Sequence, residues 1–317
     1  MEYLTLPNIS KPVSRIALGS TVFSPDDLPL TFALLDAFVE LGGTLIDTAH
    51  GYGRGKCERA LGIWIKERQS REQVVVLDKC CHPYGDSGPR VRPEVIHGDL
   101  SESLERLQTP YVDLYLLHRD DENVPVGTIV EALNEEVAHG RIRAFGGSNW
   151  RPARIAEANA YAAEHGLQGF AASSPNLALA RPKEPMWAGC ITTLDDDRAW
   201  YKETRLPLIA WSSQAGGFFT GRYSPEDRSN QDMVRVYYND ENFERLRRAR
   251  ELGQQKGFDA LQIALAWVVR QPFPTIPIIG PHTVEELHSS IKALDIDLTP
   301  DELAYLDLQK DEPLTDR

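Results

Sequence analysis

Cysteine is scarce in this chain: its 317 residues contain four cysteines, and no two of them form a CxxC pair. Cys80 and Cys81 are adjacent and cannot easily bridge each other. The spacing therefore excludes a disulfide framework and a zinc knuckle, and it predicts packed, reduced thiols in a cytoplasmic protein.

Long apolar runs and excess positive charge are also missing. No apolar run approaches the ~18 residues of a membrane span, and the start MEYLTLPNISKPV lacks the basic and apolar regions of a signal peptide. The formal net charge of −13 argues against nucleic acid or anionic membranes as partners. What is present is an ordinary globular balance, 42% hydrophobic and 26% charged. We predict one domain over residues 1–317 with small-molecule partners; the sequence carries no signal for the oligomeric state.

Short β-branched or apolar runs recur along the chain and are followed by stretches with helical spacing. The predicted strands are 15–19, 44–47, 74–79, 112–118, 142–148, 169–174, 206–212 and 275–280. The predicted helices are 29–42, 93–107, 151–166, 261–271, 283–294 and 299–308. Eight alternating units predict an α/β fold, the (β/α)8 TIM barrel, with a doubly wound sheet as the alternative. Long loops follow strand six (175–197) and strand seven (213–240), at the C-terminal face where barrel enzymes build their sites.

Polar residues end three consecutive predicted strands. Asp47 ends the second, Lys79 the third and His118 the fourth, and Tyr52 follows Asp47 by five residues. Each could be structural alone: a turn cap, a rim ion pair, a hydrogen-bonded histidine or a loop aromatic. Together they would meet at one rim, where a lysine ending the run VVVL needs a partner such as Asp47.

This set suits proton transfer to a carbonyl oxygen. The pKa of tyrosine lies near 10, and a neighbouring ammonium would lower it. A carboxylate would keep the lysine charged, and a histidine could hold the substrate oxygen. Because no side chain supplies a hydride, a reduction would also need a nicotinamide.

The motifs IDTAHGYG, VVVLDK, DLYLLH, GGSN and IPIIG…EEL resemble those of the aldo-keto reductase family, nearly from end to end. The resemblance implies a (β/α)8 barrel and interconversion of an aldehyde or ketone with an alcohol by NAD(P)(H). It also implies that Asp47, Tyr52, Lys79 and His118 form the catalytic tetrad, with Tyr52 as general acid and base.

The resemblance further implies cofactor contacts from five parts of the chain. Gly19, Ser20 and Thr21 match the loop after strand one, and Ser148 and Asn149 match the pair that holds the carboxamide, beside Asp47. Trp211 matches the aromatic residue that stacks on the nicotinamide. Ser212, Gln214, Gly217 and Arg222 match the pyrophosphate loop, and the adenine end corresponds to Gly280, His282, Glu286 and Ser290.

Two departures from the family pattern bear on the cofactor. Ala172 replaces a common glutamine, so Ser173 or Ser174 would have to replace its amide contact. His282 stands where NADPH-preferring members often have arginine, and Glu286 adds negative charge nearby; a neutral histidine binds phosphate less well than a guanidinium. We favour NADPH on family grounds, with Arg222 as a phosphate partner, and leave NADH open.

The substrate is less well defined by the sequence. Phe23, Tyr52, His118 and Trp150 are the predicted substrate contacts, and His82, Tyr84 and Trp187 add aromatic or imidazole faces in nearby loops. Such faces suit sugars and aromatic aldehydes alike; we favour a sugar and hence carbohydrate metabolism. The alternatives are a non-catalytic nicotinamide-binding regulatory subunit of the same fold and a metal-dependent barrel hydrolase. The hydrolase would need several strand-end ligands, and only Asp47 and His118 qualify, so we predict no metal.

The stretch GYGRGK (51–56) looks like a phosphate-binding loop but matches neither nucleotide pattern. A P-loop would begin at His50 and needs a hydroxyl where Cys57 stands, and Lys56 replaces the third glycine of G-x-G-x-x-G. We interpret these glycines as hinges that set Tyr52 over the mouth of the barrel.

Overall fold

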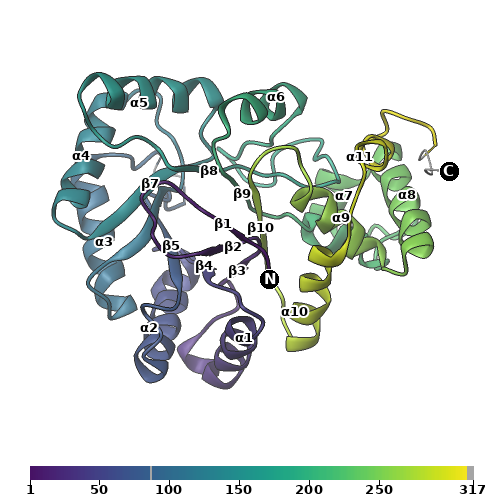
Figure 1. Ribbon diagram of the computed structural model, residues 1–317, viewed down its shortest axis with the longest axis horizontal. Helices are drawn as coiled ribbons and strands as arrows, with labels where there is room; N and C mark the ends of the chain where they lie inside the picture. Colours follow the sequence, from purple (N-terminus) through teal and green to yellow (C-terminus); the bar gives the residue numbers. More distant parts are fainter. Residues whose placement is uncertain (86–87, 313–317) are drawn as a thin grey trace.

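The computed structural model describes residues 1–85 and 88–312, and its centre is a closed barrel of eight parallel strands (Figure 1). The strands follow one another around the barrel in chain order, and the last pairs with the first. They are β3 (Ala17–Gly19), β4 (Leu45–Asp47), β5 (Val75–Cys80), β6 (Val112–Leu117), β7 (Ile142–Ser148), β8 (Ala172–Ser174), β9 (Leu208–Ala210) and β10 (Thr275–Ile279). The predicted (β/α)8 barrel is confirmed, and the doubly wound sheet is excluded.

Helices surround the barrel (Figure 1). The α-helices are α1 (Leu28–Glu40), α2 (Lys56–Arg68), α3 (Pro93–Leu107), α4 (Val126–Ala138), α5 (Pro152–Glu164), α6 (Asp195–Thr204), α7 (Gln231–Tyr237), α8 (Asp240–Lys256), α9 (Ala260–Val269), α10 (Val284–Ile291) and α11 (Pro300–Leu306). The 3₁₀ turns are η1 (Pro25–Asp27), η2 (Tyr52–Gly55), η3 (Ala215–Thr220) and η4 (Lys292–Asp295). The predicted helices are confirmed, including the Thr299 cap, which forms a capping box with Glu302.

Several helices were not predicted, among them α2, α4, α6 and α8. Charged residues dominate α8, and its buried face is carried by a few positions such as Leu246, Ala249 and Leu252. A narrow apolar stripe gives a weak periodic signal, so tertiary packing decides these helices more than the local pattern does.

A small antiparallel hairpin, β1 (Tyr3–Leu4) and β2 (Val13–Ser14), crosses the N-terminal end of the barrel (Figure 1). Leu6, Ile9 and Val13 pack with the apolar side chains inside the barrel. Ser14 Oγ accepts hydrogen bonds from the backbone N–H groups of Thr44 and Leu45, at 3.0 and 3.1 Å. The hairpin therefore plugs this end.

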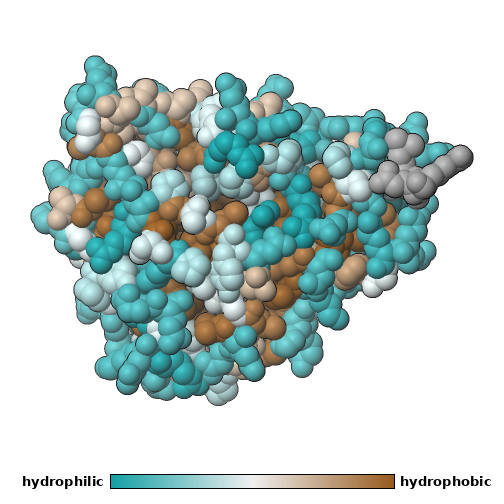
Figure 2. All heavy atoms as spheres, viewed as in Figure 1, coloured by the Kyte–Doolittle hydropathy of each residue, from teal (hydrophilic) through white to brown (hydrophobic). Residues whose placement is uncertain are grey.

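The long segments after β8 and β9 flank the opposite end of the barrel. They are largely irregular, as predicted, but the second contains η3 and α7. The face in Figure 2 is mostly hydrophilic, with smaller hydrophobic areas between polar side chains. Within residues 1–85 and 88–312, no helix has the length and apolar character of a membrane span.

Candidate active site

A cavity of about 920 Å³ lies at the C-terminal end of the barrel, and all four predicted catalytic residues line it. Asp47 is the last residue of β4, Lys79 lies near the end of β5, and His118 follows β6 directly. Tyr52 begins η2, in the loop after β4. The adjacent strands thus bring residues from distant parts of the sequence to one rim, as the period-two pattern predicted.

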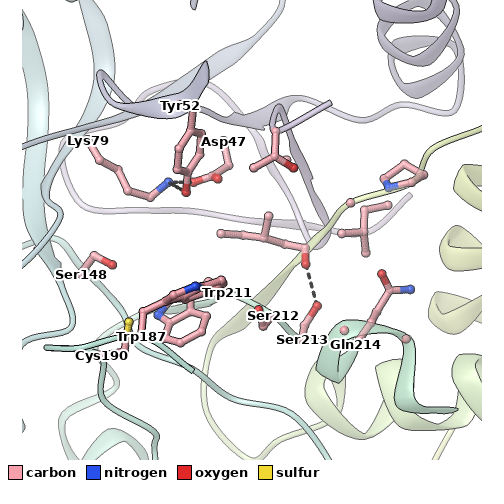
Figure 3. Close-up of a pocket in the computed structure, with 18 of the residues that line it drawn as sticks. Asp47, Tyr52, Lys79, Ser148, Trp187, Cys190, Trp211, Ser212, Ser213 and Gln214 are labelled. Carbon is pink, nitrogen blue, oxygen red and sulfur yellow. Dashed lines mark hydrogen bonds and ion pairs between the residues drawn. The ribbon is translucent and has the colours of Figure 1, made fainter. Parts of the chain in front are cut away.

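The Lys79 ammonium connects the other polar groups of this rim (Figure 3). It donates hydrogen bonds to Asp47 Oδ1, to the carbonyl oxygen of Thr48 at 3.0 Å and to the hydroxyl of Tyr52 at 3.2 Å. These three bonds use the three N–H donors of an ammonium group. Lys79 is therefore fixed in position and oriented toward Tyr52.

The charge state of Lys79 follows from its surroundings. Burial acts to lower the pKa of Lys79, but the charge of Asp47 and the hydrogen bonds to Asp47 and Tyr52 outweigh burial and raise this pKa. Burial raises the pKa of Asp47, and the lysine charge opposes that shift. The ammonium stays protonated beside the tyrosine hydroxyl.

Tyr52 differs from the expectation drawn from the sequence. Burial raises the pKa of Tyr52 above its ordinary value, while the charge of Lys79 acts in the lowering direction without prevailing. The depth at which the phenol is buried cannot be read from the sequence, so the expectation rests on the effect of Lys79 alone. At neutral pH the hydroxyl carries its proton and can donate it.

His118 lies beside Tyr52, with ring centroids 5.6 Å apart, and it also contacts His82, with ring centroids 4.6 Å apart. Burial and then the charge of Lys79 lower the pKa of His118 well below its ordinary value. The ring is therefore neutral at pH 7 and can donate one N–H to a substrate oxygen.

The loop that carries Tyr52 is held from two sides. The His50 N–H donates to the carbonyl oxygen of Lys79 at 2.9 Å, and Arg106 donates to the carbonyl oxygen of His50 at 3.2 Å. Gly53 and Gly55 have φ values of 55° and 82°, in the left-handed region. A Cβ at Gly55 would lie 2.8 Å from Arg106, so this position favours glycine for two reasons.

The predicted cofactor residues line the same cavity with one exception. Those on its wall are Gly19, Thr21, Asp47, Ser148, Asn149, Trp211, Ser212, Gln214, Gly217, Arg222, Gly280, His282, Glu286 and Ser290. Ser20 is fully buried and does not line the cavity; its Oγ is buried without a hydrogen-bond partner. It lies within the strand-end turn, where its N–H donates to the carbonyl oxygen of Asp47.

The lining residues fit a dinucleotide. A cavity of this volume is at the upper end of the range for small-molecule sites, with room for more than one ligand. Ser212, Ala215, Gly216 and Gly217 all have positive φ values, and Ser212, Gly216 and Gly217 line the cavity, so the backbone of this loop turns tightly at the cavity wall. A Cβ at Gly280 would meet nothing within 4 Å, which leaves open space at this wall.

Asn149 connects four segments around the cavity. Its side-chain amide donates to the carbonyl oxygen of His118 and to Ser148 Oγ, both at 3.1 Å. Its Oδ1 accepts from the N–H of Ile191 and from Trp211 Nε1, both at 3.2 Å. The protein thus occupies the hydrogen-bonding groups of this side chain, which orients the Trp211 indole.

Two predicted substrate residues lie away from the cavity, which corrects the expectation for them. Phe23 is 2% exposed and packs in the apolar core around the barrel. Trp150 is fully buried, packs on Phe170 at 5.0 Å between centroids, and donates to the carbonyl oxygen of Arg119. Both residues lie in short turns that follow a strand, and such turns have no periodic pattern that would show which way a side chain points.

The serines after Ala172 do not replace the missing glutamine at the cavity wall. Ser173 Oγ accepts a hydrogen bond from Tyr201 at 2.9 Å, and Ser174 Oγ is buried without a partner. The carbonyl oxygen of Ser174 instead accepts from Ser148 Oγ at 2.8 Å. Strand β8 supports the site through its backbone.

Several lining residues were not predicted, including Pro83, Arg119, Ala188, Cys190, Ser213 and Ser289. Arg119 had a signal in the sequence, because it directly follows His118 at a strand end. Cys190 and Ala188 lie in the irregular segment after β8, where no periodic pattern indicates which side chains face inward. Trp187 and Trp211 form an aromatic pair on this side, with centroids 5.9 Å apart (Figure 3).

Comparison with known proteins is consistent with this geometry. The model of the aldo/keto reductase family matches residues 15–310. A protein of Bacillus subtilis (strain 168) named uncharacterized oxidoreductase YrpG is 30% identical over 320 residues, which covers 96% of this chain and 95% of its own. Norsolorinic acid reductase stcV of Emericella nidulans is 30% identical, with 86% and 70% covered, and probable aryl-alcohol dehydrogenase AAD4 of Saccharomyces cerevisiae is 27% identical, with 87% and 86% covered. The chain is therefore an oxidoreductase that belongs to the aldo/keto reductase family.

Proposed function

We propose that this enzyme interconverts an aldehyde or ketone with the corresponding alcohol, with Tyr52 as the general acid and base. The observation that carries the proposal is the Lys79 ammonium, which bridges Asp47 and the Tyr52 hydroxyl on the wall of the cavity. A bound nicotinamide supplies or accepts the hydride in this chemistry. The metal-dependent hydrolase has no support from the family.

The protein's part of the reaction is to hold the carbonyl oxygen and give it a proton. Because Lys79 donates to the Tyr52 oxygen, the phenolic proton is free to point at the substrate. As the proton leaves, the lysine charge stabilises the phenolate at 3.2 Å. Neutral His118 donates a hydrogen bond to the same oxygen and fixes its position.

Proteins of this family use nicotinamide cofactors, and we propose NADP(H) for this one. Arg222 lines the cavity, and no carboxylate lies within 4.0 Å of it among residues 1–85 and 88–312. Glu286 accepts a hydrogen bond from the backbone N–H of His282 at 2.7 Å, so it is partly engaged by the protein. Its charge still disfavours a 2′-phosphate, and NADH is the alternative.

For the substrate we propose an aromatic carbonyl compound. The relatives named norsolorinic acid reductase and aryl-alcohol dehydrogenase support this class, and the paired rings of Trp187 and Trp211 offer an aromatic wall. The sequence alone led us to favour a sugar; the names of the relatives lead us to propose an aromatic compound instead. The sugar stays an untested prediction. Cytoplasmic location, a single domain and the absence of nucleic-acid partners also stay predictions.

The test is a screen of benzaldehydes, aryl ketones and aldoses, followed at the nicotinamide absorbance with NADPH and NADH in parallel. We expect turnover of aromatic aldehydes and a lower Kd for NADPH. Turnover of aldoses alone would overturn the substrate class, and equal or tighter NADH binding would overturn the cofactor preference. Tight cofactor binding with no turnover of any carbonyl would favour the regulatory subunit.

A further inference from the structure

Arg119 is a buried arginine on the wall of the catalytic cavity, with 8% of its surface exposed. Its Nη1 donates to the carbonyl oxygen of His118 at 2.8 Å, and its Nε donates to that of Ala188 at 3.4 Å. Its aliphatic stem passes Gly189, where a Cβ would lie 3.3 Å from Arg119 Cδ. The side chain is therefore held in place by backbone groups.

Within the part of the chain that the structure describes, the guanidinium has no anionic partner. Among the residues that the structure describes, no carboxylate oxygen lies within 4.0 Å of it, and its Nη2 has no hydrogen bond. Nη2 is nevertheless absent from the polar atoms that are sealed off without a partner, so it faces open space. A guanidinium stays charged in any protein environment and carries five N–H donors. A guanidinium beside a cavity can therefore bind an anionic group of a ligand.

The basic side chains near Arg119 at this end of the cavity, Lys79, His118 and His82, are either paired with a carboxylate or neutral. Lys79 is paired with Asp47. Burial lowers the pKa of His118 and that of His82, so both rings are neutral at pH 7. Among the described residues, Arg119 is thus the cation whose charge is left for a ligand at the catalytic end. It acts electrostatically on Tyr52 and on both histidines.

Arg222 provides an internal comparison. It also lines the cavity without a carboxylate within 4.0 Å among the described residues, but it is exposed and follows η3, on the predicted pyrophosphate loop. Of the two, Arg119 is among the main charges that act on Tyr52 and His118. The two arginines therefore serve different ends of the cavity.

We infer that Arg119 selects carbonyl substrates that carry a carboxylate, and that it binds this carboxylate while Tyr52 and His118 hold the carbonyl oxygen. The inference rests on the proposed carbonyl reductase function and narrows its substrate class to aromatic oxo-acids. A planar guanidinium matches a carboxylate with two parallel hydrogen bonds, which gives orientation as well as affinity.

The experiment compares 3- and 4-carboxybenzaldehyde with their methyl esters in the full-length enzyme. For wild type, kcat/KM should be ~10- to 100-fold higher for the better acid than for its ester, the effect of one charge-assisted hydrogen-bonded pair. Arg119→Met should bring this ratio close to one, Arg119→Lys should leave an intermediate ratio, and the matched control Arg222→Met should keep the wild-type ratio. A wild-type ratio near one, or equal loss on acid and ester in Arg119→Met, would overturn the inference.

A second readout does not need turnover. Benzoate should quench the tryptophan fluorescence of wild type, through Trp187 and Trp211, with a Kd ~10-fold or more below that of benzamide, and Arg119→Met should lose this difference. If benzoate binds in this way but no aldehyde is reduced, the anion site stands and the proposed function fails. If the esters are reduced but neither acid nor benzoate is preferred, the proposed function stands and the role of Arg119 fails.

Discussion

Two buried ion pairs lie at opposite ends of the same barrel, and they differ in what surrounds them. At the N-terminal end, Asp113 accepts from Lys11 at 3.1 Å, from Arg71 at 2.8 Å and from the N–H of Val76 at 2.9 Å. At the C-terminal end, the side-chain carboxylate of Asp47 has Lys79 as its one hydrogen-bond donor among the described residues, and Lys79 also donates to Tyr52.

The difference lies in access. At the N-terminal end, Lys11 also donates to the carbonyl oxygens of Arg71 and Val74 and to the Tyr111 hydroxyl. Protein groups therefore surround the Lys11–Asp113 pair, which we call the lower pair; the Asp47–Lys79 pair is the upper pair. At the C-terminal end, the Asp47–Lys79 pair borders the cavity, and the charge of Lys79 acts on Tyr52, which a substrate can reach. The same kind of contact therefore stabilises the fold at one end and prepares proton transfer at the other.

The largest expected contrast comes from removing the upper lysine. Lys79→Met should lower kcat by about 10³-fold, because the phenolate formed on Tyr52 loses its stabilising charge. Steady-state kinetics and thermal unfolding measured together check this. A variant that unfolds at much lower temperature but keeps kcat would make the upper pair structural, like the lower one.

The pH dependence comes next. Reduction needs the protonated Tyr52, and the pKa of this group is raised; kcat for reduction should therefore stay level from pH 6 to about 9. Oxidation needs the phenolate, so its kcat should rise about tenfold per pH unit over the same range. A plateau of the oxidation rate below pH 9 would mean that the charge of Lys79 outweighs burial and lowers the pKa of Tyr52.

The lower pair should affect stability and leave catalysis unchanged. Lys11→Met should lower the free energy of unfolding by about 2 kcal/mol, since Asp113 keeps Arg71 and loses one of its two cations. We expect kcat within about twofold of wild type. Chemical denaturation gives the free energy; a large fall in kcat at full folding would break the division between the two ends.

The smallest effect on activity should come from Trp150, which the sequence placed on the substrate. Trp150→Phe should cost about 1 to 2 kcal/mol in unfolding free energy, because the ring fills space beside Phe170. The KM for an aromatic aldehyde should change by less than about twofold. A tenfold rise in KM without loss of stability would return Trp150 to the substrate site.

The sequence predicted the parts of this molecule that depend on local pattern. Apolar runs gave all eight barrel strands, and the polar residues that end three of them gave Asp47, Lys79 and His118. The plugging hairpin was missed because each of its strands has two residues, too few for an alternating pattern.

What depends on burial and on irregular backbone could not be predicted. The raised pKa of Tyr52 depends on how many atoms surround the phenol, and Phe23 faces the core because of a turn after β3. The position of the Arg119 guanidinium at the cavity wall depends on residues 188–190, whose sequence follows no periodic pattern. Their contact with Arg119 is visible only in three dimensions.

Tyr52 acts as the proton donor in the proposed reaction, and the Tyr52→Phe variant tests this role. Tyr52→Phe removes the hydroxyl and keeps the ring that packs beside His118. We measure turnover of an aromatic aldehyde at the nicotinamide absorbance and the cofactor Kd by fluorescence titration on the same preparation. We expect turnover to fall by about 10³-fold or more while the Kd stays within about twofold of wild type. Full turnover in this variant would show that Tyr52 is not the proton donor.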